Sequence, residues 1–204
     1  GDQGVVLCYL PKSPFMHLLA LEAGVMAVTM AALTTPVEFK DLLDTMKKAF
    51  DQAAQIAVDC PADVLMIPEN LSSEMVGPEL FKMYMYEYQI EWTTKIREAG
   101  KYSFIHIDGT LAGLLKQEAE VGFTVLEALT PHPVGDMKWD EMEQFVGDSK
   151  SILWGGIPGS YFTYCVDDEE FDRHVKYLLS IMITKPRFVL GVADQVPPDG
   201  LERR

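Results

Sequence analysis

The chain has few positively charged residues. Its 204 residues include 17 Lys and Arg against 31 Asp and Glu, which gives a formal net charge of -14 at pH 7. Surfaces that bind nucleic acid or anionic membranes depend on clustered cations. The composition therefore argues against nucleic acid and against a membrane surface as partners.

Cysteine and long apolar runs are also scarce. The three cysteines, Cys8, Cys60 and Cys165, form no CxxC pair, which argues against a disulfide framework or a zinc finger and predicts reduced thiols in the cytoplasm. The apolar stretch 15–33 is interrupted by His17 and by other polar residues, so we expect a buried or lid-forming helix rather than a membrane span.

What the sequence does contain is a regular alternation of apolar runs with segments of helical period. Strands are expected at 4–10, 63–67, 102–108, 123–128, 151–155 and 187–192. Helices are expected at 14–32, 36–58, 78–99, 111–121, 138–146 and 168–183.

Six strand-then-helix steps predict an α/β fold with a parallel sheet, in a single domain over residues 1–204. Neither GxGxxG nor GxxxxGK[ST] occurs, which favours a TIM (β/α)8 barrel over a Rossmann-type sheet. Only about six βα units are present, so we expect the chain to be the C-terminal part of a longer barrel protein. A second copy of the chain or an N-terminal segment would then complete the barrel.

Polar and glycine-rich residues follow the predicted strands, as they would around the shared active-site mouth of a barrel. His106 and Asp108, at i and i+2 in Phe104–Gly109, would point to the same side of a strand. The other candidates are Glu69, Asn70, Glu127, Trp154, Gly155, Gly156 and Asp194. Imidazole and carboxylate donors suit a divalent metal, so His106, Asp108 and Asp194 are the predicted ligands.

Structural roles compete with each of these assignments. A lone histidine at a strand end is more often a hydrogen-bonded structural residue, and Asp108 before Gly109 suits an Asx turn. Asp194 could cap a short helix, and Glu69 could belong to a solvated turn. Glu127 lies in an apolar segment, where a buried carboxylate is costly without a partner, and that cost favours a functional role.

The order of several short motifs resembles the uroporphyrinogen decarboxylase superfamily, which includes cobalamin-linked methyltransferases that act on coenzyme M. The resemblance covers nearly the whole chain. The matching segments are 13–15, 62–70, 77–81, 106–109, 153–157, 188–191 and 196–198.

The resemblance implies a choice between two branches. The methyltransferases carry His-x-Cys at one strand end and a later Cys before a proline pair, and these residues bind zinc. Here those positions resemble His106, Asp108 and Asp194, which implies a harder metal site. The decarboxylases lack this His, place a His near Asp194, and have substrate-binding arginines in an N-terminal region that is absent here. The segment 127–136 is similar to an uncharacterised branch.

Three hypotheses follow. The first is a metal-dependent methyltransferase acting on a methylcorrinoid or a methylated small molecule, with zinc or manganese as the metal. In it Glu69, Glu127 and His106 are catalytic, and Asn70, Trp154, Gly155 and Gly156 bind substrate. The second is a carboxy-lyase acting on a tetrapyrrole, and the third is a non-catalytic binding fragment.

Overall fold

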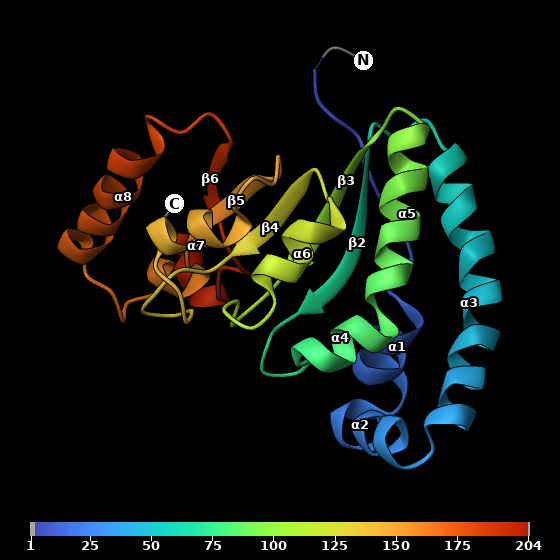
Figure 1. The fold of residues 1–204 in the computed structure, drawn as a ribbon. Coiled ribbons are helices and arrows are strands. Elements are labelled where there is room, and N and C mark those ends of the chain that lie inside the picture. Colours follow the sequence, from blue (N-terminus) through green and yellow to red (C-terminus); the bar gives the residue numbers. More distant parts are fainter. Residues whose placement is uncertain (1–2, 204) are drawn as a thin grey trace. The chain divides into compact units, whose positions relative to one another are not determined.

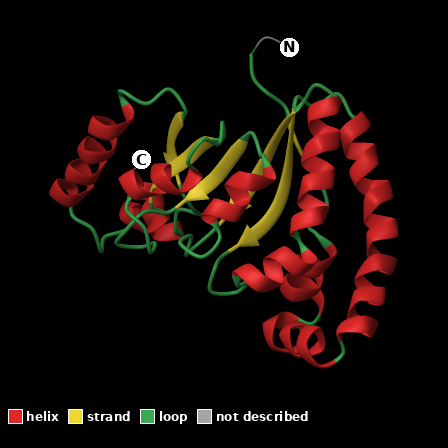
Figure 2. Ribbon diagram, viewed as in Figure 1, coloured by secondary structure: helices red, strands yellow, loops and turns green. Residues whose placement is uncertain are grey.

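The computed structural model describes residues 3–203 and has the α/β architecture that the sequence predicts (Figures 1 and 2). The strands are β1 (Leu7–Tyr9), β2 (Val64–Leu71), β3 (Tyr102–Ile107), β4 (Val125–Leu129), β5 (Ile152–Ile157) and β6 (Phe188–Val192). The α-helices are α1 (Pro14–His17), α2 (Gly24–Thr34), α3 (Pro36–Asp59), α4 (Pro78–Tyr84), α5 (Tyr86–Glu98), α6 (Leu115–Val121), α7 (Trp139–Val146) and α8 (Asp168–Met182).

Within the described residues, the strands form one six-stranded sheet whose order follows the chain, β1-β2-β3-β4-β5-β6. The pairs β1–β2, β4–β5 and β5–β6 are parallel, with Cys8 opposite Leu65 and Trp154 opposite Val189. Sequential parallel strands joined through helices are the βα units of a barrel. The predicted fold class, a partial (β/α)8 barrel, is thus confirmed.

The chain divides into two compact units. The first comprises residues 1–69 and 79–105, and the second comprises residues 70–78 and 106–204. The prediction of a single domain over residues 1–204 stays a prediction.

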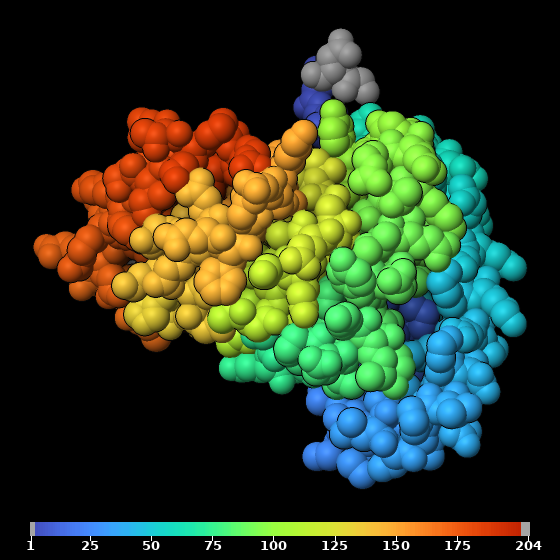
Figure 3. Space-filling model, viewed as in Figure 1, coloured from blue at the N-terminus to red at the C-terminus, as the bar shows by residue number. Residues whose placement is uncertain are grey.

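The core of the first unit is an aromatic cluster around the start of α1. Phe15 and Phe39 are buried, and Tyr84 stacks on Phe15 with 5.5 Å between ring centroids and meets the edge of Phe39 at 5.2 Å. The Ser13 hydroxyl caps α1 by accepting from the Met16 N–H at 3.3 Å. In Figure 3 the dark blue atoms of the early chain show in two places, at the top of the view and as a small patch between later segments.

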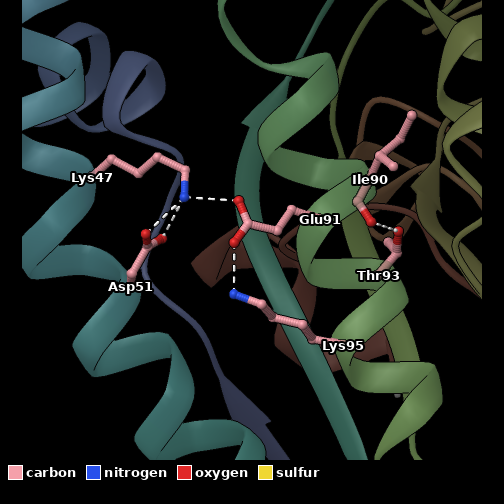
Figure 4. A network of polar contacts seen from close by, with 6 residues as sticks. All are labelled: Lys47, Asp51, Ile90, Glu91, Thr93 and Lys95. Atoms are coloured by element: carbon pink, nitrogen blue, oxygen red, sulfur yellow. Dashed lines mark hydrogen bonds and ion pairs between the residues drawn. The ribbon is translucent and has the colours of Figure 1, made fainter.

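Ion pairs join α3 and α5 in the same unit. The Lys47 ammonium lies 2.7 Å from Asp51 and 2.8 Å from Glu91, and Glu91 also pairs with Lys95 at 2.6 Å (Figure 4). Lys95 lies 4.1 Å from the centre of the Trp92 ring. The paired ammonium of Lys95 therefore lies over the ring of the buried Trp92.

The second unit packs helices against β4, β5 and β6. Leu126, Leu129 and Met142 are fully buried, and the ring of Trp139 from α7 meets the Phe188 ring of β6 edge-on at 4.3 Å. This packing holds β4, which carries Glu127, and β6, which precedes Asp194.

Two of the predicted helices are interrupted. Residues 14–32 form α1, a π-helical turn at Leu18–Glu22 and α2, because Gly24, at φ +78°, starts a new helix direction. Residues 78–99 break at Met85, whose backbone leaves helical geometry, so α4 and α5 are separate helices.

Several predicted boundaries are also wrong. The strand expected at 4–10 spans only Leu7–Tyr9. The helix expected from residue 111 begins at Leu115, because Leu114, at φ -131°, departs from helical geometry. The strand expected at 63–67 continues to Leu71, so Glu69 lies inside β2. A polar residue is tolerated there because its carboxyl group is hydrogen-bonded.

Among the helices that the structure describes, none combines the length and the apolar character needed to cross a membrane.

Candidate active site

The second unit holds a direct contact between two of the predicted site residues. His106 Nδ1 of β3 lies 2.6 Å from Glu127 Oε2 of β4, a charge-assisted hydrogen bond. The side chains are 24% and 19% exposed, so the pair is shielded but still reaches solvent.

Strand periodicity explains why the His106 side chain escapes full burial. Along the end of β3, Ile105 and Ile107 are buried while His106 between them is not. In β4, Leu126 and Ala128 are buried and Glu127 between them is half-buried. Successive residues of a regular strand point to opposite faces, so His106 lies on the face opposite Ile105 and Ile107. In β4 the alternation is interrupted, because Ala128 has φ +66° and the pairing with β5 shifts between Leu126 and Leu129.

Asp108 and Asp194 add negative charge that acts on His106 together with that of Glu127. Asp108 follows β3 directly, and its backbone N–H donates to the Leu71 carbonyl at 2.9 Å. Burial and the charge of Asp194 raise the pKa of the Asp108 carboxyl, and His106 partly offsets the rise. Asp194 follows β6, is exposed, and accepts from the Gln195 N–H at 2.5 Å.

These carboxylates act together on the imidazole. Burial lowers the pKa of His106, but the hydrogen bond and charge of Glu127, with the charges of Asp108 and Asp194, outweigh burial and raise it. The structure thus gathers His106, Asp108, Glu127 and Asp194 into one electrostatic cluster, which favours a cation among them.

The imidazole and carboxylate groups of this cluster are of the kinds that bind a divalent cation. Glu127 binds Nδ1 of His106, and a carboxylate on one imidazole nitrogen is the usual support for a histidine that ligates metal through the other. Within residues 3–200, however, no three His, Cys, Asp or Glu side chains already stand in a metal-binding arrangement. The case for a metal therefore rests on donor chemistry, not on a preformed cluster.

The Trp154-Gly155-Gly156 segment at the end of β5 is shaped by close packing. A Cβ on Gly155, at φ +147°, would overlap the carbonyl oxygen of Leu129, and the Trp154 indole lies where a Cβ on Gly191 would stand. Glycine is required at Gly155 for this approach of β4 and β5. Substrate binding by the segment stays a prediction.

His174 of α8 supports this segment. Its Nε2–H donates to the Gly156 carbonyl at 2.7 Å, and its ring lies 4.7 Å from that of Tyr161. No local motif signals this bond, because the partners are 18 residues apart.

Glu69 belongs to the first unit and has a different setting. It is fully buried, and both carboxyl oxygens accept from the Ser13 N–H at 3.2 Å. Burial raises the pKa of Glu69 to about 7, against the lowering effects of Ser13, Lys12 and Gln89. Asn70, assigned to the second unit, is exposed and has φ +52°. The alternative of a solvated turn at Glu69 is wrong, because the residue lies within β2 and its side chain is fully buried.

Comparison with known proteins agrees with this architecture. The family described as uroporphyrinogen decarboxylase (URO-D) matches residues 6–201. A search of curated proteins finds no match. A solved structure from Streptomyces avermitilis, described provisionally as an orotidine 5′-phosphate decarboxylase, is 12% identical with a TM-score of 0.50.

That similarity covers 94% of this chain but 65% of the other, so the chain spans just under two thirds of the solved structure's length. At this identity the likeness shows the fold alone.

Proposed function

The chain belongs to the URO-D family, and from that premise we propose that it serves a metal-dependent methyl transfer from a methylcorrinoid or a methylated small molecule. The observation that carries the proposal is the 2.6 Å contact between His106 and Glu127 beside Asp108 and Asp194. Three carboxylates around one imidazole favour a bound cation.

Each residue has a defined task in this proposal. His106 Nε2, Asp108 and Asp194 would hold the divalent metal, with zinc or manganese as the candidates. Glu127 accepts the Nδ1–H of His106, fixes the tautomer and keeps Nε2 available. When bound, the metal would lower the pKa of an acceptor thiol or hydroxyl.

Glu127 is the better candidate than Glu69 for moving a proton. Glu127 is 19% exposed and already shares a hydrogen bond with an imidazole. Glu69 is fully buried, and the Ser13 N–H occupies its carboxyl oxygens. The Glu127 carboxylate therefore has access to solvent without opening of the fold.

The same charges disfavour a polycarboxylate substrate. A carboxylate of a tetrapyrrole placed against Asp194 or Asp108 would be repelled by roughly 1–4 kcal/mol at contact distance in partly solvated surroundings. Among the residues that the structure describes, no Lys or Arg is one of the groups that set the pKa of His106 or Asp108. Methyl transfer therefore fits the site better than binding of several carboxylates.

Decarboxylation remains the second candidate, because the matched family is described by that activity. It would need cationic groups from outside the cluster to bind the substrate's carboxylates. A cytoplasmic location, a homo-oligomer and completion by an N-terminal segment also stay predictions.

One assay series separates the two activities. The full-length protein, grown with zinc and manganese, is analysed for metal and incubated anaerobically with methylcobalamin plus candidate thiols, and separately with uroporphyrinogen. We expect close to one divalent metal per site and metal-dependent demethylation of the corrinoid. Metal-free protein that removes carboxyl groups stepwise from uroporphyrinogen would overturn the proposal in favour of a lyase.

Matched variants test which residues carry the effect. His106→Ala and Asp194→Ala should each remove most of the metal. Asp167→Ala, which removes an exposed carboxylate at the start of α8, should leave the metal content unchanged. Equal loss of metal in all three variants would contradict the assignment of ligands.

A further inference from the structure

The Asp136 carboxylate lies outside the His106–Glu127 cluster and joins the two loops that follow β3 and β4. Asp136 lies in the loop between β4 and α7. Its Oδ1 accepts from the Leu111 N–H at 2.7 Å, and the Ala112 N–H lies 3.3 Å from Oδ1 and 3.2 Å from Oδ2. Asp136 thus joins the loop after Glu127 to the loop after His106.

The loop that presents Asp136 is tightly closed. The Gly135 N–H donates to the Pro131 carbonyl at 3.0 Å, and the His132 N–H donates to the Met137 carbonyl at 2.7 Å. A Cβ on Gly135 would overlap the carbonyl oxygen of Thr130. Only glycine fits this position, so the turn holds Asp136 at a fixed distance from the end of β4.

The loop after β3 is held on its other side as well. The Asp108 N–H donates to the Leu71 carbonyl and the Ser73 N–H to the Thr110 carbonyl, each at 2.9 Å, and the hydroxyls of Ser73 and Thr110 are 2.8 Å apart. Residues 108–112 therefore lie between a clamp on the β2 side and Asp136 on the β4 side.

We propose that Asp136 is a positioning residue that couples the loops after β3 and β4 and thereby sets the His106–Glu127 contact. A short hydrogen bond between side chains on two strands tolerates little relative movement of those strands. Asp136 removes that movement by bonding across the loops. The inference rests on the proposed function for its purpose, but its geometry does not depend on methyl transfer or on a metal.

The inference is tested by NMR, which detects the His106–Glu127 hydrogen bond directly. The chain has four histidines, so selective ¹⁵N-histidine labelling of the full-length protein gives few imidazole N–H signals, and His106→Gln identifies that of His106. A strong hydrogen bond to a carboxylate moves this signal downfield. In Asp136→Ala we expect the signal to be lost or shifted upfield at constant pH, with amide exchange at Leu111 at least tenfold faster.

Two further variants separate positioning from general stability. Asp167 accepts the Glu170 N–H at 2.7 Å at the start of α8, so Asp167→Ala removes a comparable bond away from the cluster. It should lower Tm without moving the His106 signal. Asp136→Asn, which keeps one acceptor oxygen, should give an intermediate shift and remains informative if Asp136→Ala does not fold.

An unchanged His106 signal in folded Asp136→Ala or Asp136→Asn would overturn the inference, and so would absence of the downfield signal from the wild-type protein. Absence of metal or of demethylation would overturn only the proposed function, because the signal is measured without substrate. Once a substrate is known, Asp136→Asn should lower kcat more than it raises KM.

Discussion

Glu69 in the first unit and Glu127 in the second are both strand carboxylates with hydrogen-bond partners, yet their surroundings differ. Glu69 has no exposed surface and accepts from the backbone of Ser13, and burial raises its pKa to about 7. Glu127 is 19% exposed, and its charge raises the pKa of His106. Complete burial makes a carboxyl group part of the packing, whereas partial burial beside an imidazole allows proton exchange with water.

The largest expected effect is therefore on stability, at Glu69. Glu69→Ala leaves the buried Ser13 N–H without its acceptor and opens a cavity in the first unit. We expect it to lower the free energy of unfolding by roughly 3 kcal/mol. The measurement is urea unfolding at pH 5.5, where wild-type Glu69 is largely protonated.

Glu127→Ala is the matched control for that experiment. It removes the same side chain at a half-buried position, so its cost should be about 1 kcal/mol. If the two substitutions cost the same, the difference in burial between the two carboxyl groups does not govern stability, and the comparison fails.

The second prediction concerns pH. Folded Glu69 keeps its proton up to a pKa of about 7, whereas the reference value is 4.5. Between these values the folded state binds more protons than the unfolded state, so this group's contribution to stability falls as pH rises. The loss should reach roughly 3 kcal/mol above pH 7.

The check is the difference in unfolding free energy between wild type and Glu69→Gln from pH 4.5 to 8. Glutamine keeps an acceptor oxygen but does not ionise. The unfolding free energy of the variant, relative to that of wild type, should therefore increase as pH rises. A constant difference over that range would show that burial does not raise the pKa of Glu69.

A third prediction turns from stability to the imidazole. Glu127→Gln removes both the charge and the ionic hydrogen bond that raise the pKa of His106, so that pKa should fall while unfolding free energy changes by about 1 kcal/mol or less. NMR titration of the His106 ring in both proteins measures the shift. Glu69→Gln serves as control and should leave the pKa of His106 unchanged.

The sequence predicted much of the fold because strand and helix periods are local. Strands 102–108 and 187–192 lie within one residue of β3 and β6. The start expected for the helix at residue 111 was wrong because Leu114 departs from helical geometry, and the preceding Leu111 and Ala112 N–H groups bond to Asp136, 25 and 24 residues away. A partner at that distance leaves no periodic signal.

The sequence identified candidate site residues but did not predict the contacts between them. His106 and Glu127 were both chosen, but their hydrogen bond depends on how neighbouring strands pair, which composition does not specify. The metal ligands His106, Asp108 and Asp194 stay a prediction. The supporting bond from His174 to Gly156 was not foreseen because it joins a helix to a strand end.

The smallest expected effect comes from a third kind of carboxylate, the partly exposed and ion-paired Glu91 of the first unit. Glu91 pairs with Lys47 and Lys95, and its side chain is 36% exposed. Burial raises the pKa of this carboxyl, but the two lysines outweigh burial and lower it. Water and salt screen such pairs, so Glu91→Gln should cost only about 0.5 kcal/mol.

The cost should shrink further in 1 M salt, whereas the cost of Glu69→Ala should not, because the Glu69 carboxyl is inaccessible to ions. Urea unfolding of both variants at low and high salt measures this contrast. A Glu91→Gln cost above 2 kcal/mol that persists in salt would mean that the network bridging α3 and α5 holds the first unit together as firmly as its buried carboxyl group does.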